Sequence, residues 1–245
     1  MLIGFIGDIH GDFKIYQSLC TLAETMGADC TIQGGDYGVG FGRVAADETR
    51  WSNPGNMFTE AQLIARFGPF YKQAMGSEPV GIHRFIRGNH DNPMACLQNN
   101  LWIPDGQSYN GVFCVGGAYS IDRSSRQEGW DWWPNEELSY GELEMMIENY
   151  KEAKPKIVIS HDAPECIARS MFTFYRNHHH DRTRGALEAM YACHQPDLHL
   201  TNHWHVPYIT RRGGTVFRGL GINEMVFYNT ETKVLSTATE LSEVV

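Results

Sequence analysis

The chain has 245 residues, which is enough for one large domain or two small ones. Its 29 acidic and 20 basic residues give a net charge of -9, which argues against the broad basic face that binds a phosphate backbone. We therefore expect no extended nucleic acid as a partner. No apolar run approaches the roughly 18 residues that span a bilayer, so we expect no membrane association.

The cysteines and the start of the chain both bear on location. The six cysteines are scattered, without a Cys-x-x-Cys pair, and most lie in apolar stretches. This pattern is typical of reduced, buried thiols. Residues 1–6 (MLIGFI) have no basic start, so we expect no signal peptide. The predicted location is cytoplasmic.

In chain order, strands and helices alternate through much of the sequence. Buried strands are predicted at 2–7, 30–33, 81–87, 111–119 and 156–160, and short strands at 208–210, 215–217 and 225–228. Helices are predicted at 12–26, 59–75, 136–151 and, with Thr183 as a possible cap, 183–194. The strand–helix–strand order favours parallel pairing. We expect a single domain over residues 1–236 and a flexible tail at 237–245.

Three glycine-flanked motifs each follow an apolar run: residues 7–11 (GDIHG), 35–38 (GDYG) and 88–91 (GNHD). Because the ends of parallel strands share one edge of a sheet, their Asp, His and Asn side chains are expected to lie together. Any one motif alone is more simply a turn. Three in this order predict a metal site.

Further histidines follow later in the chain. His161 comes directly after the predicted strand at 156–160, and His203 and His205 form a His-x-His pair. On an extended segment the pair would point to the same side, which fits two neighbouring metals. Exposed histidines at a sheet edge are the alternative interpretation.

Taken together, these motifs resemble the calcineurin-like metallophosphoesterase superfamily over most of the chain. The matching order is Asp8-x-His10, Gly35-Asp36, Gly88-Asn89-His90-Asp91, His161 and His203-x-His205. The resemblance implies an α/β fold, a two-sheet β-sandwich flanked by helices. It also implies that the ligands lie on loops at the C-terminal edges of the strands.

The resemblance further implies two metals that share Asp36. The first would be held by Asp8, His10, Asp36 and His205, and the second by Asp36, Asn89, His161 and His203. Imidazole combined with carboxylate suits Mn, Fe, Zn, Ni or Co. We expect two divalent transition metals, with manganese as the leading candidate.

The implied reaction is hydrolysis of a phosphate mono- or diester. A metal-bridging hydroxide would attack phosphorus in line, and His90 would protonate the departing oxygen as general acid. Asp91 is a candidate to orient His90, or else a turn residue. Candidates for phosphate contact are Arg43, Arg123 and Arg126, which lie in Gly- or Ser-rich loops.

The chain departs from the serine/threonine protein phosphatases of this superfamily. Those enzymes have Asp-Arg where this chain has Val39 and Gly40, and Glu where it has Asp91. Asn202 replaces the usual Gly of the last motif. These changes favour a small phosphoester, such as a nucleotide, over a phosphoprotein.

Three alternatives stay open at this point: a serine/threonine protein phosphatase-like enzyme, a non-catalytic protein-binding scaffold on the same fold, and a DNA nuclease. Completeness of all seven ligand positions argues against the scaffold, and the acidic balance argues against the nuclease. The sequence does not distinguish monoester from diester substrates, and it gives no oligomeric state.

Overall fold

The structure is a computed structural model that describes residues 1–42, 82–172 and 181–242. Two predictions lie outside these residues: the helix at 59–75 and the phosphate-contact candidate Arg43. Within them, no helix has the length and apolar character that a membrane span requires.

The first sheet has five strands among the described residues, in the order β11-β10-β1-β2-β3. They are β1 (Leu2–Ile6), β2 (Cys30–Gln33), β3 (His83–Phe85), β10 (Met225–Asn229) and β11 (Val234–Ser236). β1, β2 and β3 run parallel, as their order in the chain predicts, and β10 pairs antiparallel with β1. The sheet therefore joins the two ends of the chain.

The second sheet has six strands in the described part of the chain, in the order β4-β5-β6-β7-β9-β8. They are β4 (Ser108–Tyr109), β5 (Val112–Val115), β6 (Ile157–Ser160), β7 (Leu198–Thr201), β8 (Tyr208–Arg212) and β9 (Thr215–Gly219). β5, β6, β7 and β9 are parallel neighbours, and β4 and β8 are antiparallel edges.

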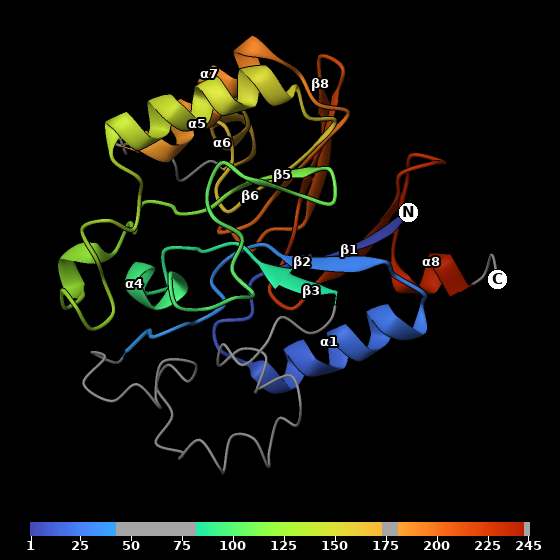
Figure 1. The fold of residues 1–245 in the computed structure, drawn as a ribbon, viewed down its shortest axis with the longest axis horizontal. Coiled ribbons are helices and arrows are strands. Elements are labelled where there is room, and N and C mark those ends of the chain that lie inside the picture. Colours follow the sequence, from blue (N-terminus) through green and yellow to red (C-terminus); the bar gives the residue numbers. More distant parts are fainter. Residues whose placement is uncertain (43–81, 173–180, 243–245) are drawn as a thin grey trace.

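Helices cover the outer faces of the two sheets (Figure 1). The described helices are α1 (Phe13–Thr25), α4 (Pro93–Cys96), the 3-10 helix η2 (Arg123–Ser125), α5 (Tyr140–Ala153), α6 (Glu165–Met171), α7 (Arg182–Cys193) and α8 (Ala238–Ser242). α1 and α8 lie on one side of the molecule, and α5, α6 and α7 lie on the other. This arrangement confirms the predicted two-sheet β-sandwich flanked by helices.

The alternation of side chains along each strand builds these layers. In β1, Ile3 and Phe5 join the apolar cluster between the sheets, whereas Ile6 joins the cluster under α1. In β6, Ile159 points inward and Val158 points toward α5 and α7. The central strands β2, β5, β6 and β7 are buried at every position because both of their faces are covered, whereas most positions of the edge strands β8 and β11 are at least partly exposed.

Capping side chains set the observed helix starts. α5 begins at Tyr140 rather than at 136, because Ser139 Oγ accepts from the Glu142 amide and the Glu142 carboxylate accepts from the Ser139 amide. The cap of α7 is Asp181, whose carboxylate accepts from the Arg184 amide at 3.0 Å, and not Thr183.

The segment predicted to be a flexible tail contains helix α8. The Glu240 carboxylate accepts from the Thr237 amide at 2.7 Å, which caps the start of the helix. Ala238 and Leu241 pack against the cluster under α1. Local capping and the partial burial of Leu241 thus favour this short helix. Residues 243–245 lie outside the described residues.

Candidate metal centre

Every predicted ligand follows the C-terminal end of a strand. Asp8 and His10 follow β1, Asp36 follows β2, Asn89 follows β3, His161 follows β6, and His203 and His205 follow β7. Because the parallel strands of each sheet end at one edge and the sheets pack face to face, all seven side chains converge. The structure therefore brings together residues that lie up to about 200 positions apart in the chain.

One group of ligand atoms is formed by Asp8, His10, Asp36 and His205, and these atoms all lie within 4.8 Å of one another. His205 Nε2 lies 3.0 Å from Asp8 Oδ2 and 2.9 Å from His10 Nε2. His10 Nδ1 lies 3.8 Å from Asp36 Oδ2. Two carboxylates and two imidazoles thus face a common point.

A second group is formed by Asp36, His161 and His203, again within 4.8 Å. His161 Nε2 lies 3.2 Å from Asp36 Oδ1 and 3.1 Å from Asn89 Oδ1. His161 Nδ1 lies 2.9 Å from the carbonyl of Gly34, which orients the ring so that Nε2 faces Asp36. Asp36 therefore belongs to both groups.

Electrostatics favour positive charge at this place. Burial is the largest single effect on His161 and disfavours its charged form, but Asp36, Asp8 and the Gly34 carbonyl together outweigh burial and raise the pKa of His161 to about 10. Burial by itself would raise the pKa of Asp36, yet His90 and His161 hold that pKa well below its usual range. The same negative potential would favour a bound cation.

The donor set and an unpartnered oxygen also fit a cation. The Asp8 side chain is fully buried, and its Oδ1 has no hydrogen-bond partner among the described residues. A buried carboxylate oxygen without a donor is costly unless a positive charge satisfies it. Imidazole, carboxylate and amide oxygen together suit a divalent transition metal.

Four of the ligand residues have left-handed backbone conformations, with φ of 45° at His10, 51° at Asp36, 66° at His203 and 56° at His205. Residues other than glycine adopt positive φ infrequently, and such residues cluster at functional sites. His203 and His205 thus lie in a turn after β7 and not on the extended segment that the His-x-His spacing suggests. The turn, rather than strand alternation, aims both rings at Asp36.

The flanking glycines allow the motifs to approach one another. A Cβ atom at Gly35 would lie 2.3 Å from His161 Nδ1, and one at Gly88 would lie 2.1 Å from Asp36 Oδ1. Any side chain at these two positions would therefore displace ligand residues. Close approach, as well as turn geometry, explains why glycine occurs here.

Asp91 binds the backbone of the second motif. Its carboxylate accepts hydrogen bonds from four backbone amides, namely those of Tyr37 at 3.1 Å, Gly38 at 2.6 Å, Val39 at 2.9 Å and Gly88 at 2.7 Å. Burial raises the pKa of Asp91 to about 6, with Asp36 adding to the effect and the backbone bonds opposing it. Its contacts in the structure connect two loops and do not reach the ring of His90.

His90 is held by Phe41, which the sequence did not single out, and by Asp36 and Arg126, whose contacts with it the sequence did not predict. Phe41 stacks on it with centroids 4.5 Å apart and planes inclined by 7°, and the His90 amide donates to Asp36 Oδ1 at 2.8 Å. Arg126 Nη2 lies 2.7 Å from His90 Nε2. Burial lowers the pKa of His90 to about 4; Asp36 opposes this shift and Arg126 adds to it.

A cavity of about 380 Å³ opens beside the two ligand groups. Its lining is Asp36, Asn89, His90, Ile121, Asp122, Arg126, His203, Trp204 and His205. Arg126 thus faces the site, and it is itself fixed by Asp122, 2.8 Å away. Arg123 is not part of the lining; its guanidinium lies 4.2 Å from the ring centroid of Tyr119.

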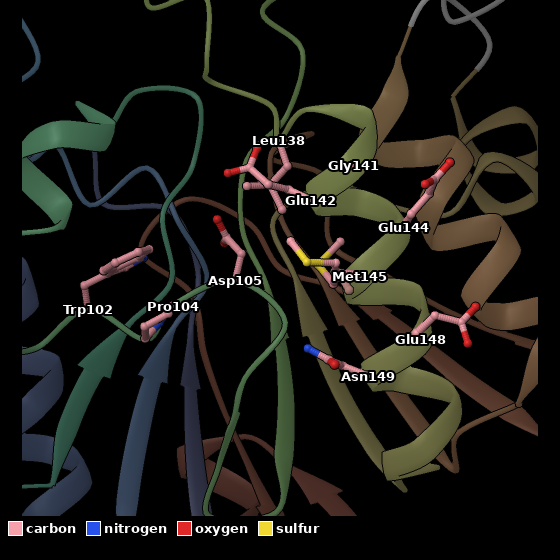
Figure 2. Close-up of a pocket in the computed structure, with 11 residues that line it drawn as sticks. Trp102, Pro104, Asp105, Leu138, Gly141, Glu142, Glu144, Met145, Glu148 and Asn149 are labelled. Carbon is pink, nitrogen blue, oxygen red and sulfur yellow. The ribbon is translucent and has the colours of Figure 1, made fainter.

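A larger hollow of about 720 Å³ lies beside α5 (Figure 2). Three of its carboxylates have partners within the protein. Asp105 pairs with Arg87, Glu142 accepts a hydrogen bond from the amide of the N-cap residue Ser139, and Glu148 pairs with Lys151. None of the candidate ligands lines it. The larger hollow therefore offers no comparable chemistry.

Ser120 and Glu136, which the sequence did not single out, act on the site through tertiary contacts. Asn89 Nδ2 donates to Ser120 Oγ at 2.9 Å, and Ser120 Oγ donates to Glu136 at 2.5 Å. This leaves Asn89 Oδ1 directed at His161. Asn202, which replaces the expected glycine, is buried and donates to the carbonyl of Ser160 at 3.2 Å. No local spacing links these partners, so only the fold reveals them.

Solved structures of other proteins share this fold. TT1561 of Thermus thermophilus superposes with a TM-score of 0.56 at 16% identity, covering 96% of this chain and 97% of that one. A proposed 5'-nucleotidase from Staphylococcus aureus, solved in complex with alpha-ketoglutarate, gives a TM-score of 0.50 at 16% identity, covering 97% of this chain and 53% of that one. At such identities the similarity shows the fold alone.

No curated protein gives a significant match to the sequence. The sequence profile described as calcineurin-like phosphoesterase matches residues 1–207. This match covers well over half of the chain and confirms the resemblance carried by the motifs. The chain belongs to the dimetal-dependent calcineurin-like phosphoesterase family and is a phosphoric ester hydrolase.

Proposed function

We propose that this chain is a cytoplasmic enzyme that hydrolyses a small phosphate mono- or diester, possessing a dinuclear centre in which Asp36 is the shared ligand. The observation that carries the proposal is the membership of Asp36 in both ligand groups, at the wall of the 380 Å³ cavity. Asp8, His10 and His205 would complete one site, and Asn89, His161 and His203 the other. Manganese is the expected metal.

When bound, two such cations would polarise the phosphoryl group and lower the pKa of a water between them. The residues of this chain would do the rest. His90 would donate a proton to the departing oxygen, and the rigid stack against Phe41 would keep its ring directed into the cavity.

Arg126 is the residue that we propose to contact the phosphoryl oxygens. Its guanidinium donates to His90 Nε2, so both groups already converge on one place. A phosphoryl oxygen that engaged Arg126 would release Nε2 to carry a proton. Its negative charge would also favour the imidazolium form of His90 and so raise the pKa of that group.

The position of Arg126 in the chain also favours a small phosphoester over a phosphoprotein as the substrate. Val39 and Gly40 supply no charged pair at the second motif, and Val39 is buried with its amide bonded to Asp91. The cation beside His90 instead comes from the segment around η2. The cavity is small, which suits a nucleotide or a similar small phosphoester.

The first test is hydrolysis of p-nitrophenyl phosphate and bis-p-nitrophenyl phosphate by chelator-free protein supplied with Mn²⁺, combined with metal analysis. We expect two bound cations and turnover of at least one substrate. A chain that binds no metal and hydrolyses neither substrate would refute the proposal.

The role of His90 has its own test, because a good leaving group needs little protonation. His90→Ala should lower the rate about 100-fold or more for phenyl phosphate, and less for p-nitrophenyl phosphate. The control is His194→Ala, since His194 bonds the carbonyl of Pro155 and is not part of the cavity lining. Equal losses on both substrates would exclude a general-acid role.

A further inference from the structure

Two residues beside the ligands have no role in the chemistry described so far. Asp162 directly follows His161, and Trp204 lies between His203 and His205. Trp204 Nε1 donates to Asp162 Oδ1 at 2.8 Å. The residues next to three candidate ligands are therefore joined by one hydrogen bond that crosses from the end of β6 to the turn after β7.

Arg184 of α7 completes this connection. Its Nε donates to Asp162 Oδ2 at 2.8 Å, and its Nη2 lies 3.0 Å from Asp181 Oδ2. Its Cζ lies 4.7 Å from the centroid of the Trp204 ring, which also stacks on Phe172 at 4.3 Å. Arg184 and Asp162 are both buried, at 1% and 0% exposure.

The contribution of the buried Asp162–Arg184 ion pair to stability does not by itself explain why the pair is present. Removing two charges from water costs about as much as their attraction returns, so a buried ion pair is weak evidence for stabilisation. The turn it contacts has left-handed residues at His203 and His205, which the surroundings must hold in place. Trp204 is the residue between them.

We propose that Asp162, Arg184 and Trp204 form a clamp that positions His203 and His205 for cation binding. They are positioning residues that act through the two histidines, one of which belongs to each ligand group. The inference rests on the proposed dinuclear centre.

Within the turn, the Trp204 amide donates to the carbonyl of Asn202 at 2.7 Å, which holds the backbone. The Trp204 indole contacts Asp162, Arg184 and Phe172 from other elements, so the orientation of the imidazoles on either side of it depends on the clamp.

The test measures Mn²⁺ affinity of metal-free protein by calorimetry, with folding checked by circular dichroism. Trp204→Phe keeps an aromatic ring for stacking but removes the N–H that binds Asp162. Arg184→Met keeps the length of the side chain but removes its charge. We expect both variants to bind Mn²⁺ about 10–100-fold more weakly than the wild type.

Matched controls are Trp102→Phe, at the larger hollow, and Arg182→Met, the neighbouring arginine on α7 whose guanidinium lies over Tyr140. Both should bind Mn²⁺ within about twofold of the wild type. Should Arg184→Met fail to fold, Trp204→Phe decides the question. The double variant should lose less affinity than the two single losses predict, since both act through Asp162.

Two outcomes would overturn the inference, and they are distinct. Wild-type protein that binds two cations alongside a folded Trp204→Phe variant of unchanged affinity would exclude the clamp but leave the proposed function intact. If Trp204→Phe lowers the unfolding temperature but leaves the Mn²⁺ affinity unchanged, the three residues only stabilise the fold, and the clamp is likewise excluded. Wild-type protein that binds no Mn²⁺ would exclude both the clamp and the proposed function.

Discussion

The candidate ligands from the first sheet and those from the second are held in different ways. After β1, β2 and β3, Asp36 and Asn89 lie in short loops fixed by backbone hydrogen bonds, four of which end on the carboxylate of Asp91. After β6 and β7, the histidines lie beside a side-chain network that includes Asp162 and Arg184. In the first half, backbone amides bonded to one carboxylate hold the loops, with Ser120 orienting Asn89; in the second half, side chains bonded to one another surround the histidines.

This difference explains why the contacts of one half can be predicted from the sequence and those of the other cannot. Backbone-held loops need glycine and aspartate at fixed local spacing, so the three N-terminal motifs are conspicuous. A side-chain network draws on residues from separate elements, so its members have no shared spacing. Both halves meet at Asp36, which belongs to both groups of candidate ligands.

The largest expected effect comes from the residue that joins the halves. Asp36→Asn removes a charge from both ligand groups while keeping the size of the side chain. The loss of several kcal/mol of transition-state stabilisation corresponds to a fall in kcat/KM of about a thousandfold or more. The measurement is steady-state hydrolysis of p-nitrophenyl phosphate with Mn²⁺.

The control for that variant is Asp197→Asn, at an exposed ion pair with Lys233. Its kcat/KM should stay within about twofold of the wild type, because exposed ion pairs contribute little. Retention of more than about a tenth of wild-type activity in Asp36→Asn would contradict a shared, charged ligand.

Next in size is the effect of disrupting the backbone-held half. Asp91→Ala would leave four backbone amides without their acceptor at a buried position. We expect a loss of about 3 kcal/mol in the free energy of unfolding, since each buried unsatisfied group is costly. For a chain of this size that lowers the unfolding temperature by roughly 10 °C, measurable by calorimetry.

Asp197→Ala is the matched change at an exposed aspartate and should shift the unfolding temperature by no more than about 2 °C. A similarly small shift in Asp91→Ala would mean that water can replace the carboxylate. The two loops would then not depend on Asp91, and the contrast between the halves would fail.

Apolar runs and turn signals in the sequence predicted most of the individual strands and helices, and the family resemblance implied the two-sheet sandwich that they form. The glycine-flanked motifs and the family resemblance together predicted the ligand set, which the structure brings into two groups around Asp36. Helix starts were less accurate, because caps such as Ser139 and Asp181 compete with nearby polar residues.

The surroundings of the site could not be predicted in the same way. Phe41 lies 49 positions before His90 in the chain, and Arg126 lies 36 positions after it, yet both contact its ring. The left-handed turn at His203 and His205 is likewise a tertiary effect. Residue type and spacing give no signal for such contacts, because packing of separate elements creates them.

Removal of the metal tests whether both halves hold the same pair of ions. At a free Mn²⁺ concentration of 100 times Kd, binding contributes about 2.7 kcal/mol per site to the free energy of unfolding. Chelation should therefore lower the unfolding temperature by about 5–10 °C for each occupied site, and added Mn²⁺ should restore it. Asp36→Asn should lose most of this response. If the chelator does not change the unfolding temperature of the wild type, the protein has no stabilising bound ions.

The smallest expected effect on activity is that of replacing Arg126, and Arg123 on the same segment around η2 is the control. Arg126 lines the cavity and contacts His90, whereas Arg123 lies over Tyr119 outside the lining. Loss of one charge-assisted hydrogen bond to phosphate is worth about 2 kcal/mol, so Arg126→Ala should lower kcat/KM about 30-fold. Arg123→Ala should change it by less than about threefold. Equal losses would mean that the segment contributes its overall charge, whereas a loss confined to Arg126 would show that one guanidinium binds the phosphoryl group directly.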